Sequence, residues 1–500
     1  MSLKGNIISG YVSQIYVALI GVLILPLYIR YMGAEAYGLI GFFTMLQAWF
    51  SLLDMGLTPT IGRETARYRA GASGGVEFRR LFRVLSCIFY GLAFIGGGVL
   101  FFLSEKISAS WLKPVALSAN DIQTALQIMA ITIALRWIGG LYRGVVSGSE
   151  QIIWLSAFNV IIATLRFVVV LPVMLLYGAT PFVFFWFQLL VSVIEVVGLF
   201  YKSRLLLPIL GAERIGWSIE PIKPVLKFSL SIAFTSAVWI LVTQSDKLIL
   251  SNVLALSEYG HFTLAVLMAS GIMVISGPIS LVIMPRMAKL HMENMRSDLI
   301  KVYRDATQIV SVISGAAAIT MFFCSETVVY LWTGDAKLAQ EVSPILSLYS
   351  VGNGILSIGA FPYYLQYAKG NLKYHLFGNL GLLLFLIPLI ILAAREYGAI
   401  GAGIVWVAMN AIYLFVWVAY VHYKLEPGIH LKWIMRDVLT IISPAILIGA
   451  LFEYVMLKVF HYNGNSFVYL TFFGLVVLAT AILGSSYSRS IFSSKVLARG

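Results

Sequence analysis

Charged residues are scarce in this chain, and that scarcity excludes an ordinary soluble globular protein. Of its 500 residues, 11% are charged and 60% are apolar. A water-soluble fold cannot bury so large an apolar fraction, so the hydrocarbon of a lipid bilayer must be the solvent of most of the chain. We therefore expect an all-α polytopic membrane protein.

Cysteine and clustered histidine are also nearly absent, which argues against a disulfide framework and a metal centre. Cys87 and Cys324 lie in separate apolar runs without metal-ligand spacing, and no two of the six histidines are spaced i, i+4. The sequence also lacks a glycine-rich phosphate loop and a Ser–His–Asp set. We therefore expect no enzyme, no bound metal and no cofactor, while coupling to protons or sodium ions stays open.

The net charge of +13 reflects membrane topology rather than nucleic-acid binding, because the basic residues are spread over short loops. On the map of apolar segments, 26 basic residues fall on the side of the N-terminus and six on the other side. Both termini are therefore expected in the cytoplasm. The fourteen expected spans are 7–29, 37–57, 82–103, 122–142, 153–177, 182–201, 228–254, 259–284, 306–331, 344–367, 376–394, 402–421, 438–457 and 467–484.

An internal repeat runs through this map at a spacing of about 220 residues. Residues 177–179 (Tyr-Gly-Ala) recur at 397–399, and residues 35–38 align with 257–260. Six spans per half is an even number, so the repeat is parallel, as in many secondary transporters. We expect two six-helix lobes at 1–227 and 228–436, followed by two additional helices and a tail at 437–500.

Charged side chains within the expected spans are candidates for a functional site, because burying a charge in hydrocarbon is costly. The cations are Arg136, Arg166 and Lys247, and Arg30 lies at the outer end of the first span. Arginine matches phosphate oxygens with paired donors and keeps its charge. These four residues are therefore predicted to line the path of an anionic headgroup such as a diphosphate.

Structural roles for the same cations stay open. Arg136 would snorkel to the cytoplasmic surface, Arg166 would pair with Glu195, and Arg30 would anchor the membrane interface. Asp246 and Lys247 would form an ion pair with groups on neighbouring spans.

The seventh expected span carries a polar stripe. Ser229, Ser236, Thr243 and Lys247 are spaced by seven, seven and four residues, so they share one face of a helix. A polar face ending in a charge is typical of a helix that lines a water-filled cavity.

Three motifs carry a resemblance to a known family. They are residues 25–38 (LPLYIRYMGAEAYG), residues 57–64 (LTPTIGRE), and residues 244–251 (QSDKLILS) followed by 258–260 (EYG). With these motifs the chain resembles Wzx-type polysaccharide or O-antigen lipid flippases of the multidrug/oligosaccharidyl-lipid/polysaccharide (MOP) exporter superfamily.

The resemblance implies two lobes around a central cavity with alternating access. It implies a substrate, an undecaprenyl-diphosphate-linked oligosaccharide of an O-antigen, capsule or exopolysaccharide, moved across the bacterial inner membrane. If an ion is coupled to transport, Asp54, Glu195 and Asp246 are the candidate carriers. Expected partners are this polyprenyl-diphosphate-linked glycan, membrane lipids, a glycan polymerase and a chain-length regulator, but no nucleic acid. The basic loops 63–83 and 286–304 would either gather anionic lipid headgroups or simply report topology.

Three alternative functions stay open. A lipid II flippase would share the span number and the cationic cavity, whereas an ion-coupled drug or metabolite antiporter for organic cations would need a mainly acidic cavity. A membrane glycan polymerase or glycosyltransferase would need a sizeable extramembrane loop, and the longest expected outward loop, 104–121, is too short for one.

Overall fold

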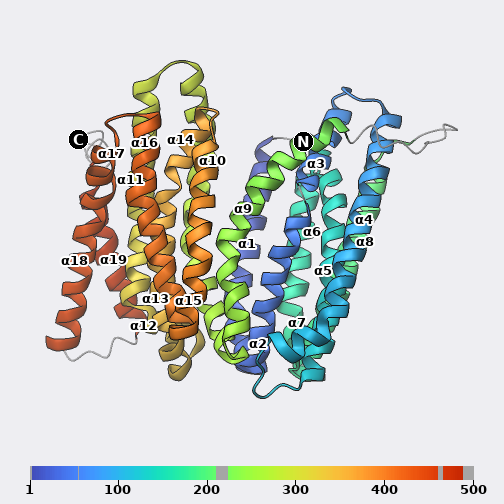
Figure 1. Ribbon diagram of the computed structural model, residues 1–500, viewed down its shortest axis with the longest axis horizontal. Helices are drawn as coiled ribbons and strands as arrows, with labels where there is room; N and C mark the ends of the chain where they lie inside the picture. The colour runs from blue at the N-terminus through green and yellow to red at the C-terminus, as the bar shows by residue number, and fades with distance from the viewer. Residues whose placement is uncertain (1–2, 55, 210–222, 460–465, 488–500) are drawn as a thin grey trace. The chain divides into compact units, whose positions relative to one another are not determined.

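The structure, a computed structural model, describes residues 3–54, 56–209, 223–459 and 466–487, and every regular element in these residues is a helix (Figure 1). This confirms the expected all-α class. The chain divides into two compact units, Met1–Gly260 and His261–Gly500. The lobe boundary expected at residues 227 and 228 precedes this division by one helix, and the three expected domains stay a prediction.

The first unit contains nine helices and the first turn of a tenth among its described residues. They are α1 (Leu3–Leu23), α2 (Leu25–Phe50), α3 (Leu57–Arg69), α4 (Gly75–Lys106), α5 (Ala119–Gly148), α6 (Ile152–Ala163), α7 (Val170–Tyr177), α8 (Pro181–Leu206), α9 (Lys223–Val253) and the start of α10 (Leu256–Met292). A 3-10 helix, η1 (Ser51–Asp54), and two π-helical segments, η2 (Ile107–Trp111) and η3 (Thr164–Val169), adjoin them.

The second unit continues α10, and its last two α-helices pack on each other. Its further elements are α11 (Arg296–Phe323), α12 (Ser325–Thr333), α13 (Ala336–Gly359), α14 (Phe361–Ala368), α15 (Lys373–Ile412), η5 (Tyr413–Trp417), α16 (Val418–Leu425), α17 (His430–Lys432), η6 (Trp433–Leu439), α18 (Thr440–Tyr454), η7 (Val455–Val459) and α19 (Phe467–Gly484). Helices α18 and α19 pack on each other and on α11.

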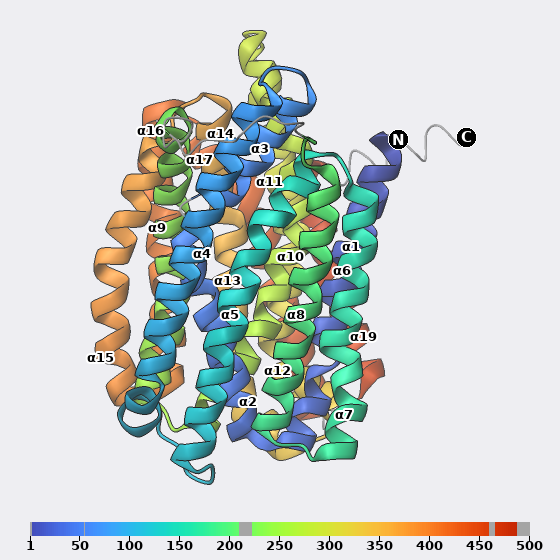
Figure 2. The same ribbon diagram turned by 90° about the vertical axis from the view of Figure 1, so that its right-hand side faces the viewer.

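Helices α4, α5 and α8 lie side by side and form the core of the first unit (Figure 2). Phe89 stacks on Trp137 at a centroid distance of 4.4 Å, within an apolar cluster that includes the fully buried Leu141. The start of α5 is fixed by Ser118, whose hydroxyl accepts the N–H of Asp121. Such caps satisfy backbone donors at a helix start and so fix where each helix begins.

Eleven helical segments among the described residues are long and apolar enough to cross a bilayer, which supports a multi-pass membrane protein. The expected count of fourteen is not confirmed by this number. Two of the segments contain a break, at Gly33 (φ +83°) and at Gly398 (φ +56°). A helix cannot continue through a positive φ, and both breaks fall between spans that the sequence analysis separates.

The same hydrogen-bonded turn recurs at corresponding positions of the repeat. At four helix ends a residue has a positive φ, and its N–H donates to the carbonyl oxygen three residues earlier. The N–H of the following residue donates to the carbonyl oxygen five residues before it. This is the Schellman arrangement that ends a helix. The turns centre on Glu150 and Gly370, 220 residues apart, and on Gly71 and Asn294, 223 apart. The local geometry thus agrees with the repeat in the sequence.

Two glycines that the repeat aligns also pack on each other's helices. A Cβ on Gly38 would lie 2.2 Å from the carbonyl oxygen of Leu256, and one on Gly260 would lie 2.3 Å from that of Ala34. Because the obstacles are backbone atoms, no side chain can move aside to make room. The absence of a side chain therefore permits α2 and the start of α10 to touch.

We expect Gly38→Ala to lower stability by about 1–3 kcal/mol, because the new methyl group forces α2 away from Leu256. The matched control is Gly91→Ala in α4, where a Cβ meets nothing within 4 Å. Thermal unfolding of the detergent-solubilised protein measures both. Equal midpoints for the two variants would contradict the close packing.

Candidate functional site

Arg136 of α5 is held inside the first unit by three neutral acceptors. Its Nη1 donates to Gln47 of α2 at 2.7 Å, its Nη2 to Gln188 of α8 at 2.8 Å, and its Nε to Ser192 of α8 at 3.0 Å. The guanidinium also lies 5.0 Å from the ring centroid of Phe43. The side chain is thus bonded to two neighbouring helices, and within the described part of the chain no carboxylate is among its hydrogen-bond acceptors.

Glu195 of α8 binds two further arginines of the same unit. Its Oε1 accepts from Arg143 of α5 at 2.8 Å, and its Oε2 accepts from Arg166 of η3 at 2.6 Å. The glutamate is 9% exposed, so both contacts are well shielded from solvent. Breaking a buried ion pair is costly because the remaining charge is left uncompensated. The pairing of Arg166 with Glu195 that the sequence analysis left open is therefore present.

A single side chain links the two arginine sites. Gln188 accepts from Arg136 through Oε1 and donates through Nε2 to the main-chain carbonyl of Arg166 at 2.9 Å. That carbonyl belongs to the π-helical segment η3, where the regular helical pattern is interrupted. Such segments occur frequently at functional sites. We call Arg136, Arg143, Arg166, Gln188 and Glu195 the arginine network.

A cavity of about 620 Å³ opens beside this network within the first unit. Arg136 and Asp54 contribute its charged lining, and Gln47, Thr58 and Ser236 contribute polar atoms. Asp54 is engaged by Thr58, whose hydroxyl donates to the carboxylate at 2.5 Å. Of the polar stripe expected on the seventh span, Ser236 lines the cavity, Thr243 and Lys247 are not in its lining, and the side chain of Ser229 lies outside the described residues.

The other candidate residues lie apart from this network. Lys247 of α9 donates to its neighbour Asp246 at 3.1 Å and to the carbonyl of Thr243 at 2.7 Å. Asp246 is 2% exposed, which makes this an ion pair with a buried carboxylate. Arg30 of α2 is exposed. Of the four predicted cations, Arg136 alone is in the lining of this cavity, and Gln188 connects Arg136 to the main-chain carbonyl of Arg166.

Arg143 is the charged member of the network that the sequence analysis missed, because the expected span ended at residue 142 whereas α5 continues to Gly148. The spacing of polar residues along the two helices could have indicated the role of Arg143. Arg136 and Arg143 are seven residues apart on α5, and Gln188, Ser192 and Glu195 are spaced by four and three on α8. Residues at these intervals share a helix face.

The chain has the same fold as solved proteins of the MOP type. The lipid II flippase MurJ in an inward closed conformation aligns over 98% of this chain and 99% of its own, with a TM-score of 0.69 and 17% identity. A multidrug resistance MATE family transporter of the MOP superfamily, inward-facing, aligns over 83% and 96%, with a TM-score of 0.67 and 13% identity. Identities this low establish the fold alone.

A third solved structure also aligns with this chain. A MOP superfamily transporter from Pyrococcus furiosus Vc1, reported with reverse polarity of its binding pocket, aligns over 85% of this chain and 98% of its own at a TM-score of 0.53 and 14% identity. No curated protein matches the chain significantly.

Residues 3–291 match the family described as polysaccharide biosynthesis protein. The match spans more than half of the chain, so the chain belongs to that family. The resemblance to Wzx-type members of the MOP superfamily drawn from the sequence motifs is thereby confirmed. The solved structures it resembles are transporters or flippases rather than enzymes.

We expect Glu195→Gln to destabilise the first unit by about 3–5 kcal/mol, because two arginines lose their shared anion. The control is Glu293→Gln, which removes an exposed pair with Lys289 at 3.6 Å and costs about 0–1 kcal/mol. Thermal unfolding in detergent compares the two. A Glu195→Gln midpoint as high as that of the control would show that the arginines do not depend on this carboxylate.

A second ionic cluster lies at the ends of the candidate membrane spans of the second unit, and its carboxylate, Glu426, lies outside them. Glu426 accepts from Arg296 at 2.6 Å and from Lys369 at 2.5 Å. Burial by itself would raise the pKa of the Glu426 carboxyl, but the hydrogen bonds from Lys369 and Arg296 outweigh it and hold that pKa below its ordinary value of 4.5. The ionised carboxylate therefore stabilises the loop that follows α16.

A lowered folded-state pKa contributes stability that is present above 4.5 and lost as the pH falls through the folded value. We therefore expect Glu426→Gln to lower the unfolding midpoint near neutral pH. The difference from wild type should shrink as the pH falls below 4.5. Thermal unfolding at a series of pH values measures this difference, and one that grows on acidification would refute the assignment.

Proposed function

We propose that this protein is a flippase that moves an undecaprenyl-diphosphate-linked oligosaccharide, a repeat unit of an O-antigen, capsule or exopolysaccharide, across the bacterial inner membrane. Both termini would lie in the cytoplasm, as the distribution of basic residues indicates. The transport cycle would make and break no covalent bonds. A glycan polymerase and a chain-length regulator are the proposed protein partners.

The observation that carries this proposal is the environment of Arg136. The cation lines a cavity, yet its hydrogen-bond acceptors are two amides and a hydroxyl, so they orient the guanidinium without cancelling its charge. A charge held in place by neutral dipoles keeps its attraction for an anion. A diphosphate group carries at least two negative charges, and its oxygens match the paired donors of arginine.

The balance of charge supports an anionic substrate over an organic cation. Arg136, Arg143 and Arg166 outnumber Glu195 in the arginine network, and Asp54 is the acidic residue in the cavity lining. An antiporter for organic cations would need an excess of carboxylates there. If transport is coupled to protons or sodium ions, we propose Asp54 as the carrier, because Glu195 and Asp246 are already bound to cations.

A lipid II flippase is the second candidate, favoured by alignment with MurJ over nearly the whole length of both chains. Its substrate also presents a polyprenyl diphosphate, so the same cavity chemistry applies. The identity of the sugar therefore has to be decided by a substrate comparison.

We expect liposomes containing the purified protein to move an undecaprenyl-diphosphate oligosaccharide between leaflets, measured by its accessibility to a membrane-impermeant sugar-modifying reagent. Arg136→Met should slow this movement by about tenfold or more, because a hydrogen bond to a charged group contributes about 1.5–3 kcal/mol. Arg395→Met, at an exposed position of α15, is the matched control.

Lipid II in the same liposomes distinguishes the two flippase candidates. Faster movement of lipid II than of several other oligosaccharide lipids would favour the second candidate. Equal rates for Arg136→Met and Arg395→Met would remove the cavity arginine from the mechanism. No movement of any glycolipid, with or without an ion gradient, would overturn the proposed function.

A further inference from the structure

A second charged cavity lies in the second unit, where the start of α11 meets η6 and the end of α19. Its volume is about 340 Å³, which is within the range of about 300–1,000 Å³ of small-ligand pockets. The cations of its lining are Lys301, Arg304 and Arg436, and Asp305 is the carboxylate. We call this the α11–η6 cavity.

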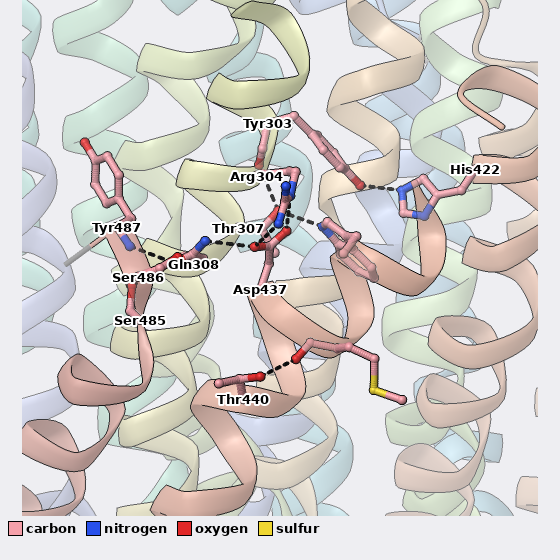
Figure 3. A network of polar contacts seen from close by, with 12 residues as sticks. Tyr303, Arg304, Thr307, Gln308, His422, Asp437, Thr440, Ser485, Ser486 and Tyr487 are labelled. Atoms are coloured by element: carbon pink, nitrogen blue, oxygen red, sulfur yellow. Dashed lines mark hydrogen bonds and ion pairs between the residues drawn. The ribbon is translucent and has the colours of Figure 1, made fainter. Parts of the chain in front are cut away.

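The wall of this cavity is fixed by a hydrogen-bond network that Figure 3 shows. Arg304 donates to Asp437 through Nε at 2.6 Å and through Nη2 at 3.0 Å. Gln308 donates to the same carboxylate at 2.8 Å. Its Oε1 accepts from Ser485, Ser486 and the N–H of Tyr487 at 2.9, 3.2 and 3.0 Å. The segment after α19 is thereby tied to α11.

This network leaves positive charge available in the cavity. Asp437 is fully buried and occupies two donors of Arg304, so Nη1 of that arginine is left for another acceptor. Within the described part of the chain, Lys301 and Arg436 make no hydrogen bond or ion pair. Even when Asp305 and Asp437 are both counted against the three cations, one positive charge is in excess.

The donors of the cavity match a phosphate group. Guanidinium and ammonium groups from two helices, with the hydroxyl of Ser297, can surround several oxygens at once. Exposed apolar surface lies close in the sequence to the cavity lining: Met435, next to Arg436, is 50% exposed, and Leu483, three residues before Ser486, is 68% exposed. An acyl chain beside a bound headgroup would cover this surface.

We propose that the α11–η6 cavity binds a phosphate group at the membrane surface, carried by an anionic phospholipid or present as a free phosphate ion. The bound group would lie against the network that joins α11 to the segment after α19, and would stabilise it. This proposal does not depend on the transported substrate, since the arginine network belongs to the first unit.

The test uses the full chain in detergent, titrated separately with dioleoylphosphatidylglycerol, dioleoylphosphatidylcholine and inorganic phosphate, with the thermal unfolding midpoint as readout. We expect phosphatidylglycerol to raise the midpoint more than phosphatidylcholine does. In the double variant Lys301→Ala/Arg436→Ala the apparent affinity should fall about tenfold or more, because two charged donors are lost. Neither side chain makes a hydrogen bond or an ion pair within the described part of the chain, so the variant should fold.

The matched control is Lys289→Ala/Lys432→Ala, which removes two cations outside the cavity lining. A midpoint rise with phosphatidylglycerol alone, lost in the first double variant and kept in the control, identifies the phospholipid headgroup. A rise with inorganic phosphate as well identifies a site open to free phosphate. The proposal would be overturned by no midpoint rise with phosphatidylglycerol or inorganic phosphate. It would also be overturned by a rise that survives Lys301→Ala/Arg436→Ala, or by an equal loss of the rise in the control.

Discussion

The polar interior of the first unit depends on the shared carboxylate of Glu195. A charge cannot stay in a low-dielectric interior unless it is paired or hydrogen-bonded, and Glu195 serves two arginines from different segments, α5 and η3. The residues one and two turns before it on α8, Ser192 and Gln188, hold a third arginine. One face of α8 therefore fixes how α5 and η3 lie against it.

The different partners of these arginines explain why one of them is suited to meet a ligand. Arg143 and Arg166 share the carboxylate of Glu195, while Arg136 is oriented by amides and a hydroxyl and faces a cavity. Neutral acceptors position a cation without removing its attraction for an anion. The paired arginines stabilise the scaffold, and the one with neutral partners keeps its electrostatic potential for the cavity.

The second unit also contains a buried carboxylate that binds polar side chains of a neighbouring helix. Arg304 and Gln308 of α11 meet the fully buried Asp437, and Gln308 also holds the chain that follows α19 (Figure 3). Polar side chains thus join the last helices to α11. In a bilayer the lipid tails are as apolar as the helix surfaces, so apolar contacts give little preference for one packing of the helices over another. Directional hydrogen bonds supply that preference.

The sequence by itself determined the helical class, the separation of spans at Gly33 and Gly398, and the deep charges Arg136, Arg166 and Lys247. These follow from apolar length, local backbone geometry and the cost of burying charge, which act over a few residues. The tertiary structure decided which partner each charge has. Arg143 joins Glu195 because α5 extends beyond its apolar run and α8 crosses beside it, a contact between residues 52 positions apart. No local pattern specifies such a contact, since it depends on how whole helices pack.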